Sequence, residues 1–239
     1  QRFSAEYSDR PLDYYRNLRV TNPSNYLYFY DFGDYQIIGA SPESLVSVKQ
    51  GQVTTNPIAG TRPRGQDERE DKALAEELLA DEKEVAEHRM LVDLGRNDIG
   101  KIAQNNSVEV TKYMEVEYFR YVMHLTSVVR GQLLPQLTAM DALKSTLPAG
   151  TVSGAPKIRA MKRIYELEQE KRGVYAGAIG YLSAIGDMDF AIAIRTMILK
   201  NGIAYVQAGA GIVYDSIPAN EYQETINKAK SMTKIGEMQ

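Results

Sequence analysis

The sequence contains no cysteine and only two histidines among its 239 residues. Without cysteine, a disulfide framework, a thiolate metal site and a cysteine nucleophile are all excluded. With so few histidines, any bound metal ion must be held mainly by oxygen atoms, and oxygen ligands suit a hard cation such as Mg²⁺.

Long apolar runs and a charge excess are missing as well. The longest strongly apolar stretch, Phe190 to Ile194, is far shorter than the roughly 18 residues that cross a bilayer. The start, Gln1-Arg2-Phe3, carries no secretory signal, so we expect a cytoplasmic protein with no membrane partner. The 28 Lys and Arg residues against 31 Asp and Glu residues give a net charge of −3, which argues against a nucleic-acid partner.

The composition is that of an ordinary globular domain. With 44% hydrophobic and 25% charged residues, the chain has enough apolar material for a large core. No linker or internal repeat marks a boundary, so we expect one domain over residues 1–239. Because there is no initiator Met, we expect this domain to be part of a longer chain.

Apolar periodicity changes along the chain. It is near two in the stretches 26–32, 35–40 and 45–48, which are separated by turn residues and predict β-hairpins. From Asp67 to Arg96 it is near 3.6, which predicts two helices. Asp81 followed by Glu84 is typical of a capping box, so we place the break near Asp81.

The rest of the chain alternates strands and helices. Strands are expected over 108–119, 121–129, 174–183, 189–199 and 203–208, and helices over 139–145, 156–170 and 218–233. Hairpin-linked strands with interspersed helices favour an α+β fold with a mainly antiparallel sheet.

Two predicted helices each carry a pair of glutamates three residues apart. Glu84 and Glu87 form one pair, and Glu221 and Glu224 form the other. The spacing places each pair on one helix face, where carboxylates are suited to holding Mg²⁺. Acidic residues near a helix start also stabilise the helix dipole by roughly 0.3 to 1 kcal/mol, so spacing alone leaves both interpretations open.

Three glycine-containing stretches, 57–62, 148–157 and 208–211, have backbone N–H groups that can bind an anion. None matches a standard nucleotide-binding motif, and a structural turn or bulge is the commoner role of such glycines.

Arg195 and His124 interrupt apolar strands. A buried guanidinium needs a carboxylate partner, which either the protein or a ligand supplies. A histidine in a strand is usually a core residue, but histidine is also the most common proton-transfer side chain.

Taken together, these signals resemble a known family. The matching stretches are 58–65, 81–98, 147–157, 177–181, 194–196, 208–211 and 221–229. They are similar to the chorismate-binding domain of anthranilate synthase component I, in the chorismate-utilising superfamily. The resemblance covers nearly the whole chain and implies a large, mainly antiparallel β-sandwich flanked by helices. It also implies that the N-terminal, tryptophan-binding region of the family is not included.

The resemblance implies a role for most of the conspicuous residues. Glu87 and Glu224 would bind Mg²⁺, and Glu84 and Glu221 would hold its waters. Tyr175, Arg195, Gly209, Ala210 and Gly211 would bind the enolpyruvyl carboxylate of chorismate, and Gly60 and Thr61 would line its ring.

The implied reaction has two stages, in which ammonia replaces the ring hydroxyl and pyruvate is then eliminated to give anthranilate. Glu43 is the candidate acid for the departing hydroxyl, and His124 the candidate that assists pyruvate elimination. Thr151 matches a position near the reacting ring.

Ala59 stands where relatives that make aminodeoxychorismate carry a nucleophilic lysine, and this favours direct attack by ammonia. The family implies a glutamine amidotransferase subunit as the source of ammonia from glutamine. Asn25, Tyr26 and Leu27 match a segment that contacts the feedback inhibitor tryptophan. The alternatives are an aminodeoxychorismate or isochorismate synthase, and a fragment that binds ligand without turnover.

Overall fold

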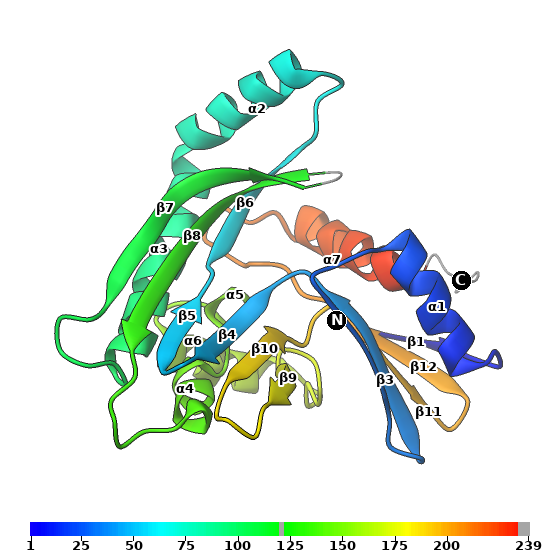
Figure 1. The fold of residues 1–239 in the computed structure, drawn as a ribbon. Coiled ribbons are helices and arrows are strands. Elements are labelled where there is room, and N and C mark those ends of the chain that lie inside the picture. Colours follow the sequence, from blue (N-terminus) through cyan, green and yellow to red (C-terminus); the bar gives the residue numbers. More distant parts are fainter. Residues whose placement is uncertain (120–121, 234–239) are drawn as a thin grey trace. The chain divides into compact units, whose positions relative to one another are not determined.

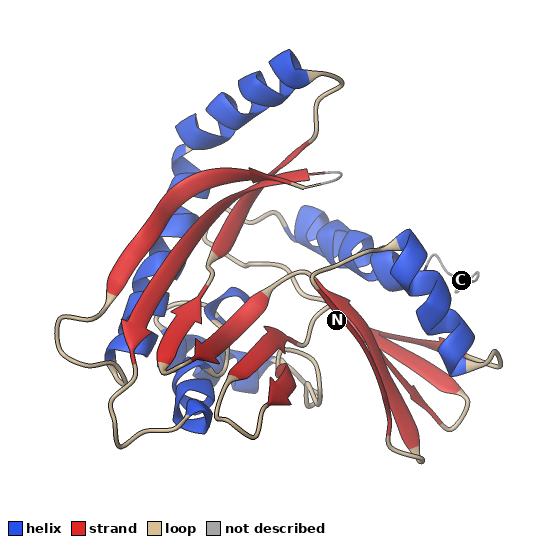
Figure 2. Ribbon diagram, in the orientation of Figure 1, coloured by secondary structure: helices blue, strands red, loops and turns tan. Residues whose placement is uncertain are grey.

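The computed structural model describes residues 1–119 and 122–233, which form two compact units (Figure 1). The first unit comprises Gln1–Glu43, Arg163–Ile179 and the chain from Ala191 onward, and the second comprises Ser44–Lys162 and Gly180–Phe190. Each unit combines a β-sheet with helices (Figure 2), which confirms the expected α+β class. The single domain expected over 1–239 stays a prediction, and residues 234–239 lie outside the described part.

The sheet of the first unit has five antiparallel strands in the order β1-β12-β11-β3-β2. These strands are β1 Arg2–Glu6, β2 Tyr26–Asp31, β3 Tyr35–Ser41, β11 Thr196–Lys200 and β12 Ile203–Gln207. The predicted hairpin is confirmed, since β2 pairs with β3 and places Phe29 opposite Ile38. Gly33 in the turn has a φ of 80°, which glycine adopts without strain.

Two helices, α1 Pro11–Thr21 and α7 Pro218–Thr233, pack on the core of the first unit. Tyr14 and Leu18 of α1 and Met232 of α7 are buried against strand residues such as Ile38 and Met197. The hydroxyl of Tyr14 also donates a 2.5 Å hydrogen bond to the carbonyl of Met232. The sequence does not predict α1, because only a narrow apolar face stands out among its polar residues.

The sheet of the second unit has seven strands, ordered β6-β8-β5-β4-β10-β9 with β7 paired to β8. They are β4 Ser44–Lys49, β5 Gln52–Thr55, β6 Ile58–Pro63, β7 Glu109–Tyr118, β8 Val122–Gln132, β9 Ala178–Leu182 and β10 Met188–Ile192. β8 pairs with β5 and β6 along one edge and with β7 along the other. Tyr121, the expected start of this strand, lies outside the described residues.

Five helices lie between the strands of this part of the chain, two between β6 and β7 and three between β8 and β9. They are α2 Glu68–Ala80, α3 Glu82–Gly100, α4 Ala139–Thr146, α5 Gly150–Ser153 and α6 Lys157–Leu167. The predicted break at Asp81 is confirmed, since its side chain caps α3 by accepting from the backbone N–H groups of Lys83 and Glu84. A Cβ on Gly131 would lie 2.6 Å from Cγ2 of Ile99, so this glycine lets α3 pack closely on β8.

One expected strand is wrong. Residues 189–199 form two strands, β10 and β11, which belong to different sheets. The break includes Arg195, which has a φ of 49°, a conformation that a regular strand does not contain. The strand expected from residue 174 begins only at Ala178, because the chain turns at Ala176 with a φ of 65°.

Among the described residues, no helix combines the length and the apolar character that crossing a bilayer requires.

Candidate functional site

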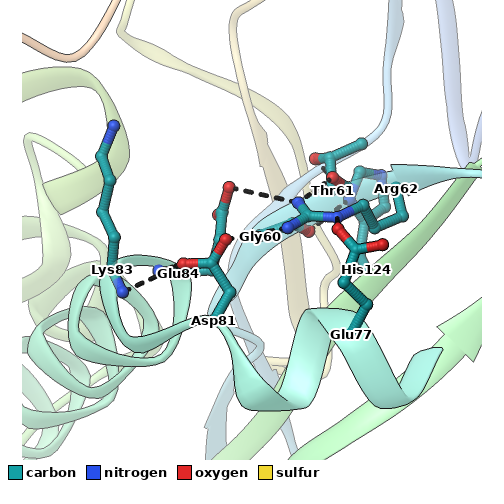
Figure 3. Close-up of polar contacts among 8 residues, drawn as sticks. All are labelled: Gly60, Thr61, Arg62, Glu77, Asp81, Lys83, Glu84 and His124. Atoms are coloured by element: carbon teal, nitrogen blue, oxygen red, sulfur yellow. Dashed lines mark hydrogen bonds and ion pairs between the residues drawn. The ribbon is translucent and has the colours of Figure 1, made fainter. Parts of the chain in front are cut away.

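In the second unit, the predicted ring-binding residues lie on β6, directly beside β8. Thr61 pairs with His124, and the register shifts between Ala59 and Thr61. Gly60 occupies this bulge with a φ of 75°, which only glycine adopts readily. The bulge therefore brings the backbone of Gly60 and the side chains of Thr61 and His124 together (Figure 3).

Hydrogen bonds define the tautomer of His124. Its Nδ1 lies 3.0 Å from the carbonyl oxygen of Gly60 and 3.0 Å from Oγ1 of Thr61. A carbonyl oxygen only accepts, so Nδ1 carries the proton and Nε2 is the proton acceptor of the neutral ring. The ring of Phe119 packs edge-on against the imidazole at 5.4 Å between centroids. These contacts fix the orientation of the His124 ring, and its role in proton transfer stays a prediction.

Glu84, the first glutamate of the α3 pair, faces this bulge. Its Oε2 is 3.3 Å from the point where a Cβ of Gly60 would lie. Its Oε1 is 3.6 Å from Arg62, a β6 residue to which the sequence analysis assigned no role. Arg62 also contacts Glu77 and Asp81 (Figure 3). The pKa of Asp81 lies below its ordinary value because its carboxylate accepts from the backbone of Glu84 and from Arg62.

Glu87, one turn further along α3, is exposed, whereas the adjacent His88 is fully buried. Nε2 of His88 lies 2.6 Å from the hydroxyl of Ser127 on β8. Burial lowers the pKa of His88 to about 4. His88 therefore anchors α3 to the sheet as a neutral side chain, and the glutamate beside it faces solvent.

Thr151 lies on α5, which packs closely on α3. A Cβ on Gly150 would lie 2.2 Å from Cδ2 of Leu94. After α5, Lys157 forms a buried ion pair with Asp98 at 2.6 Å, which fixes the segment to the end of α3. Thr151 itself is exposed, and its proximity to the reacting ring stays a prediction.

In the first unit, Arg195 is partly buried beside Tyr175. Burial lowers the pKa of Arg195, while the nearby Tyr175, Glu43 and Glu224 act in the opposite direction. Within residues 1–119 and 122–233, no carboxylate lies within 4.0 Å of its guanidinium. The sequence leaves open whether the carboxylate partner of Arg195 comes from the protein or from a ligand, and this geometry favours a ligand.

The glycine stretch after β12 lies against Tyr175. A Cβ on Gly209 would be 2.8 Å from the hydroxyl oxygen of Tyr175, so the two groups touch. Lys228 of α7 donates to the carbonyl of Gly209 at 3.0 Å and lies 2.5 Å from Oε1 of Glu224. Lys228 was missed by the sequence analysis, although its spacing of four residues from Glu224 was a usable signal.

Glu43 is held through its backbone, since its carbonyl accepts from the N–H of Ile192 at 3.0 Å. Glu221 lies in the first turn of α7, where the helix dipole stabilises a carboxylate. Ala210 and Gly211 follow Gly209 in the same loop.

The four residues that the family resemblance implies for metal binding are glutamates, which offer only oxygen donors. Glu84 and Glu87 lie on α3, and Glu221 and Glu224 lie on α7. In the described part of the chain, no cluster of three or more His, Cys, Asp or Glu side chains is arranged to hold an ion. The donor chemistry nevertheless fits Mg²⁺, because carboxylate oxygens are the ligands that this ion prefers. In the structure Glu84 and Glu224 are each paired with a cationic side chain, Arg62 and Lys228.

The segment expected to contact tryptophan begins β2. Tyr26 and Leu27 pair with Ser41 and Ala40, and Leu27 packs on the core of the first unit. Asn25 precedes the strand, and a role of this segment in inhibition stays a prediction. Ala59 lies in β6 opposite Leu125, beside the bulge at Gly60.

Comparison with known proteins finds one matching family and several relatives. The family described as chorismate binding enzyme matches residues 1–234. Anthranilate synthase component 1 from Lactococcus lactis is 64% identical over 99% of this chain and 52% of its own length. The same component from Pseudomonas aeruginosa is 58% identical over 97% of this chain and 47% of its own length. The chain thus spans about half the length of the curated relatives that it matches.

Solved structures agree with this grouping. The crystal structure of anthranilate synthase component I from Streptococcus pneumoniae is 82% identical in sequence and has a TM-score of 0.92. The match covers 98% of this chain and 52% of the chain in that structure. The menaquinone-specific isochorismate synthase from Escherichia coli is 29% identical, with a TM-score of 0.76 over 85% of this chain and 46% of its own. The chorismate-utilising fold expected from the sequence is therefore confirmed.

Proposed function

The chain belongs to the chorismate binding enzyme family, and from this premise we propose that it is the catalytic part of an anthranilate synthase component I. It converts chorismate and ammonia into anthranilate, pyruvate and water, the first step of tryptophan biosynthesis. The observation that carries this proposal is Arg195 of the first unit, which lies beside Tyr175 and has no carboxylate of the described residues within 4.0 Å of its guanidinium.

The enolpyruvyl carboxylate of chorismate is assigned to Arg195. A guanidinium forms paired hydrogen bonds with a carboxylate, and burial strengthens them. The hydroxyl of Tyr175 and the backbone of Gly209, Ala210 and Gly211 supply further donors. The ring of chorismate is assigned to Gly60 and Thr61, which lie beside His124.

Proton transfer is assigned to two residues. Glu43 donates a proton to the leaving hydroxyl as ammonia forms the new C–N bond, so that water departs. His124 then assists elimination of the enolpyruvyl group as pyruvate, a proton-transfer role that histidine commonly has. Thr151 is proposed to contact the same ring.

Mg²⁺ is the proposed cofactor, with Glu87 and Glu224 as direct ligands and Glu84 and Glu221 as ligands through water. When bound, Mg²⁺ draws electron density toward the ring carboxylate, which aids loss of the hydroxyl. The protein contributes carboxylates on two helices, and those of Glu84 and Glu224 are each oriented by a neighbouring cation.

Ammonia is proposed to attack the ring directly. Alanine at position 59 has no amine that forms a covalent adduct, so an aminodeoxychorismate or isochorismate synthase is not favoured. We assign the supply of ammonia to a glutamine amidotransferase subunit, feedback inhibition to tryptophan bound near Asn25 to Leu27, and the enzyme to the cytoplasm.

A product assay tests the proposal. The chain, incubated with chorismate, ammonium and Mg²⁺, is expected to produce anthranilate, identified by its fluorescence and its mass. A longer chain that includes the preceding half of the relatives is assayed in parallel. Isochorismate or aminodeoxychorismate as the product of either chain would contradict the proposal, and ligand-induced thermal stabilisation without any product would favour a binding fragment.

A further inference from the structure

Arg62 makes more polar contacts than a simple surface ion pair. It lies on β6, immediately after Thr61, and its side chain is only 18% exposed. Its guanidinium reaches Oε1 of Glu77 at 3.0 Å and Oδ2 of Asp81 at 2.8 Å. A third nitrogen, Nη1, donates to the carbonyl of Thr61 at 3.0 Å and lies 3.6 Å from Oε1 of Glu84 (Figure 3).

These contacts join the ring-binding strand to the first turn of α3. Asp81 caps this helix and accepts from the backbone N–H of Glu84 at 3.1 Å. Arg62 therefore holds both the backbone on which Glu84 is carried and the carboxylate of Glu84 itself. The hydrogen bond from Arg62 to the carbonyl oxygen of Thr61 also fixes the guanidinium to β6.

The carboxylate of Glu84 is held against the bulge at Gly60. Oε2 of Glu84 lies 3.3 Å from the point where a Cβ of Gly60 would be, and Oε1 faces Arg62. Three acidic side chains surround one guanidinium, and without it their mutual repulsion would move the flexible Glu84 side chain away.

Arg64, two residues further along, offers a matched comparison. It binds both carboxylate oxygens of Asp71 at 3.0 Å through Nε and donates to the carbonyl of Phe119 at 2.7 Å. Arg64 thus also joins this strand segment to α2, but these partners, Asp71 and Phe119, are not among the proposed site residues. It forms an ion pair of the same kind without contact to Glu84.

We propose that Arg62 is a positioning residue that holds the carboxylate of Glu84 in place for the cation and substrate, an inference that rests on the proposed function. Two effects of Arg62 on cation binding oppose each other. Its positive charge weakens the attraction of Glu84 for a cation, whereas its hydrogen bonds reduce the conformational freedom that Glu84 loses on binding. If positioning dominates, removing Arg62 weakens cation binding; if charge dominates, removing it strengthens cation binding.

The test measures Mn²⁺ binding by the electron paramagnetic resonance of free Mn²⁺, with chorismate present and ammonium absent so that no turnover occurs. Arg62→Met is expected to raise the Mn²⁺ dissociation constant by roughly ten- to a hundredfold, as for other residues that orient a metal ligand. Arg62→Lys is expected to lose most of this affinity too, because one ammonium cannot replace a guanidinium that contacts several groups. Arg64→Met is expected to leave the constant within about twofold of the unaltered chain.

A double variant shows whether Arg62 acts through Glu84. In a Glu84→Gln chain, adding Arg62→Met is expected to change the dissociation constant by less than about twofold. The inference would be overturned if Arg62→Met weakened Mn²⁺ binding further in the Glu84→Gln chain. It would also be overturned if Arg62→Met alone left Mn²⁺ binding unchanged or made it tighter, or if Arg62→Lys bound Mn²⁺ with full affinity. An equal loss in Arg64→Met would overturn it as well. Melting temperatures of all variants are measured, and if Arg62→Met does not fold, Arg62→Lys decides.

The anthranilate assay separates this inference from the proposed function. An unaltered chain that makes anthranilate, together with an Arg62→Met chain that binds Mn²⁺ normally, overturns the inference alone. An unaltered chain that neither binds Mn²⁺ nor makes anthranilate overturns both.

Discussion

At the residue scale, the contact between Gly209 and Tyr175 is the tightest constraint on the proposed substrate loop. The hydroxyl of Tyr175 occupies space within 2.8 Å of a Cβ position on Gly209. A side chain at residue 209 must therefore displace either the loop or the tyrosine, and both are assigned to the enolpyruvyl carboxylate.

Gly209→Ala is accordingly expected to lower kcat/KM for chorismate by roughly tenfold to a hundredfold, the cost of misplacing binding groups by about 1 Å. Steady-state anthranilate fluorescence measures this change. Gly100→Ala is the control, because a Cβ at residue 100 meets no atom within 4 Å. Tyr175→Phe removes the hydroxyl, so Gly209→Ala should cost less in a Tyr175→Phe chain than in the unaltered chain if the clash is the cause; an equal cost in both would contradict that explanation.

Glu224 is the second decisive residue, because it is assigned as a direct metal ligand and is held by Lys228. Glu224→Gln keeps the shape of the side chain but removes its charge, so kcat/KM is expected to fall by at least about a hundredfold. Glu166→Gln, which removes an exposed carboxylate paired with Arg163, should retain activity. Full activity of the Glu224→Gln chain across a Mg²⁺ titration would refute the ligand assignment.

At the element scale, Asp98 connects the end of α3 to the segment that follows α5. Its carboxylate pairs with two lysines that differ in burial, since Lys157 is 11% exposed and Lys101 is 61% exposed. Lys157 also donates to the carbonyl of Thr146.

Lys157→Met is expected to lower the free energy of unfolding by about 3 kcal/mol, because it leaves a buried carboxylate without its buried partner. Lys101→Met, which removes the exposed partner of the same carboxylate, should cost less than about 1 kcal/mol. Urea unfolding of the two variants measures both values. Equal losses would show that burial of the lysine does not determine the strength of this pair.

The hairpin of β2 and β3 gives a pH-dependent prediction. The ring of Tyr28 lies over Gly39 on the opposite strand, and its hydroxyl is 2.6 Å from Oγ1 of Thr196. Burial raises the pKa of Tyr28 from 10 to about 12. Because this pKa is higher in the folded than in the unfolded state, the contribution of Tyr28 to stability is fully present below pH 10. It is lost as the pH rises toward 12.

This single group is expected to remove about 1 kcal/mol of folding free energy between pH 9 and pH 11. The measurement is urea unfolding at both pH values for the unaltered chain and for Tyr28→Phe. The variant should lose less stability over this interval, whatever its stability at pH 9. An identical pH dependence in the two chains would exclude ionisation of Tyr28 as a cause.

The sequence predicts elements well where local signals are complete. The hairpin at Gly33 and the helix break at Asp81 follow from turn and capping chemistry within a few residues. The break at Arg195 did not follow, because Phe190 to Ile194 is continuously apolar while the change of sheet is decided by distant pairing. Tertiary context similarly determines α1, whose apolar residues are few.

The candidate site likewise contains residues that the sequence identifies and residues that only the fold reveals. The resemblance supplied Gly60, Thr61 and His124, and the structure places them together. Arg62 and Lys228 received no role in the sequence analysis, because charged residues are common and only the fold shows which carboxylates they contact.

At the scale of the whole molecule, the proposed chemistry depends on which nitrogen source the chain uses. Ammonia attacks as the free base, so at fixed total ammonium and saturating chorismate the rate should rise about tenfold for each pH unit below the ammonium pKa, as long as the enzyme groups keep their protonation states. Glutamine alone should yield no anthranilate until an amidotransferase subunit is added. Anthranilate formed from glutamine by the purified chain would contradict the division of labour proposed above.

The pairing of β8 has a consequence for biosynthesis. β5 ends at Thr55 and β6 at Pro63, whereas β8 begins only at Val122, yet both strands form hydrogen bonds with β8, as does β7. A nascent polypeptide that ends before Val122 therefore has exposed strands whose partner has not yet left the ribosome. Such long-range pairing slows folding and leaves strand edges open to aggregation, so a chaperone that covers β5 and β6 during translation would be expected to improve the yield of folded protein.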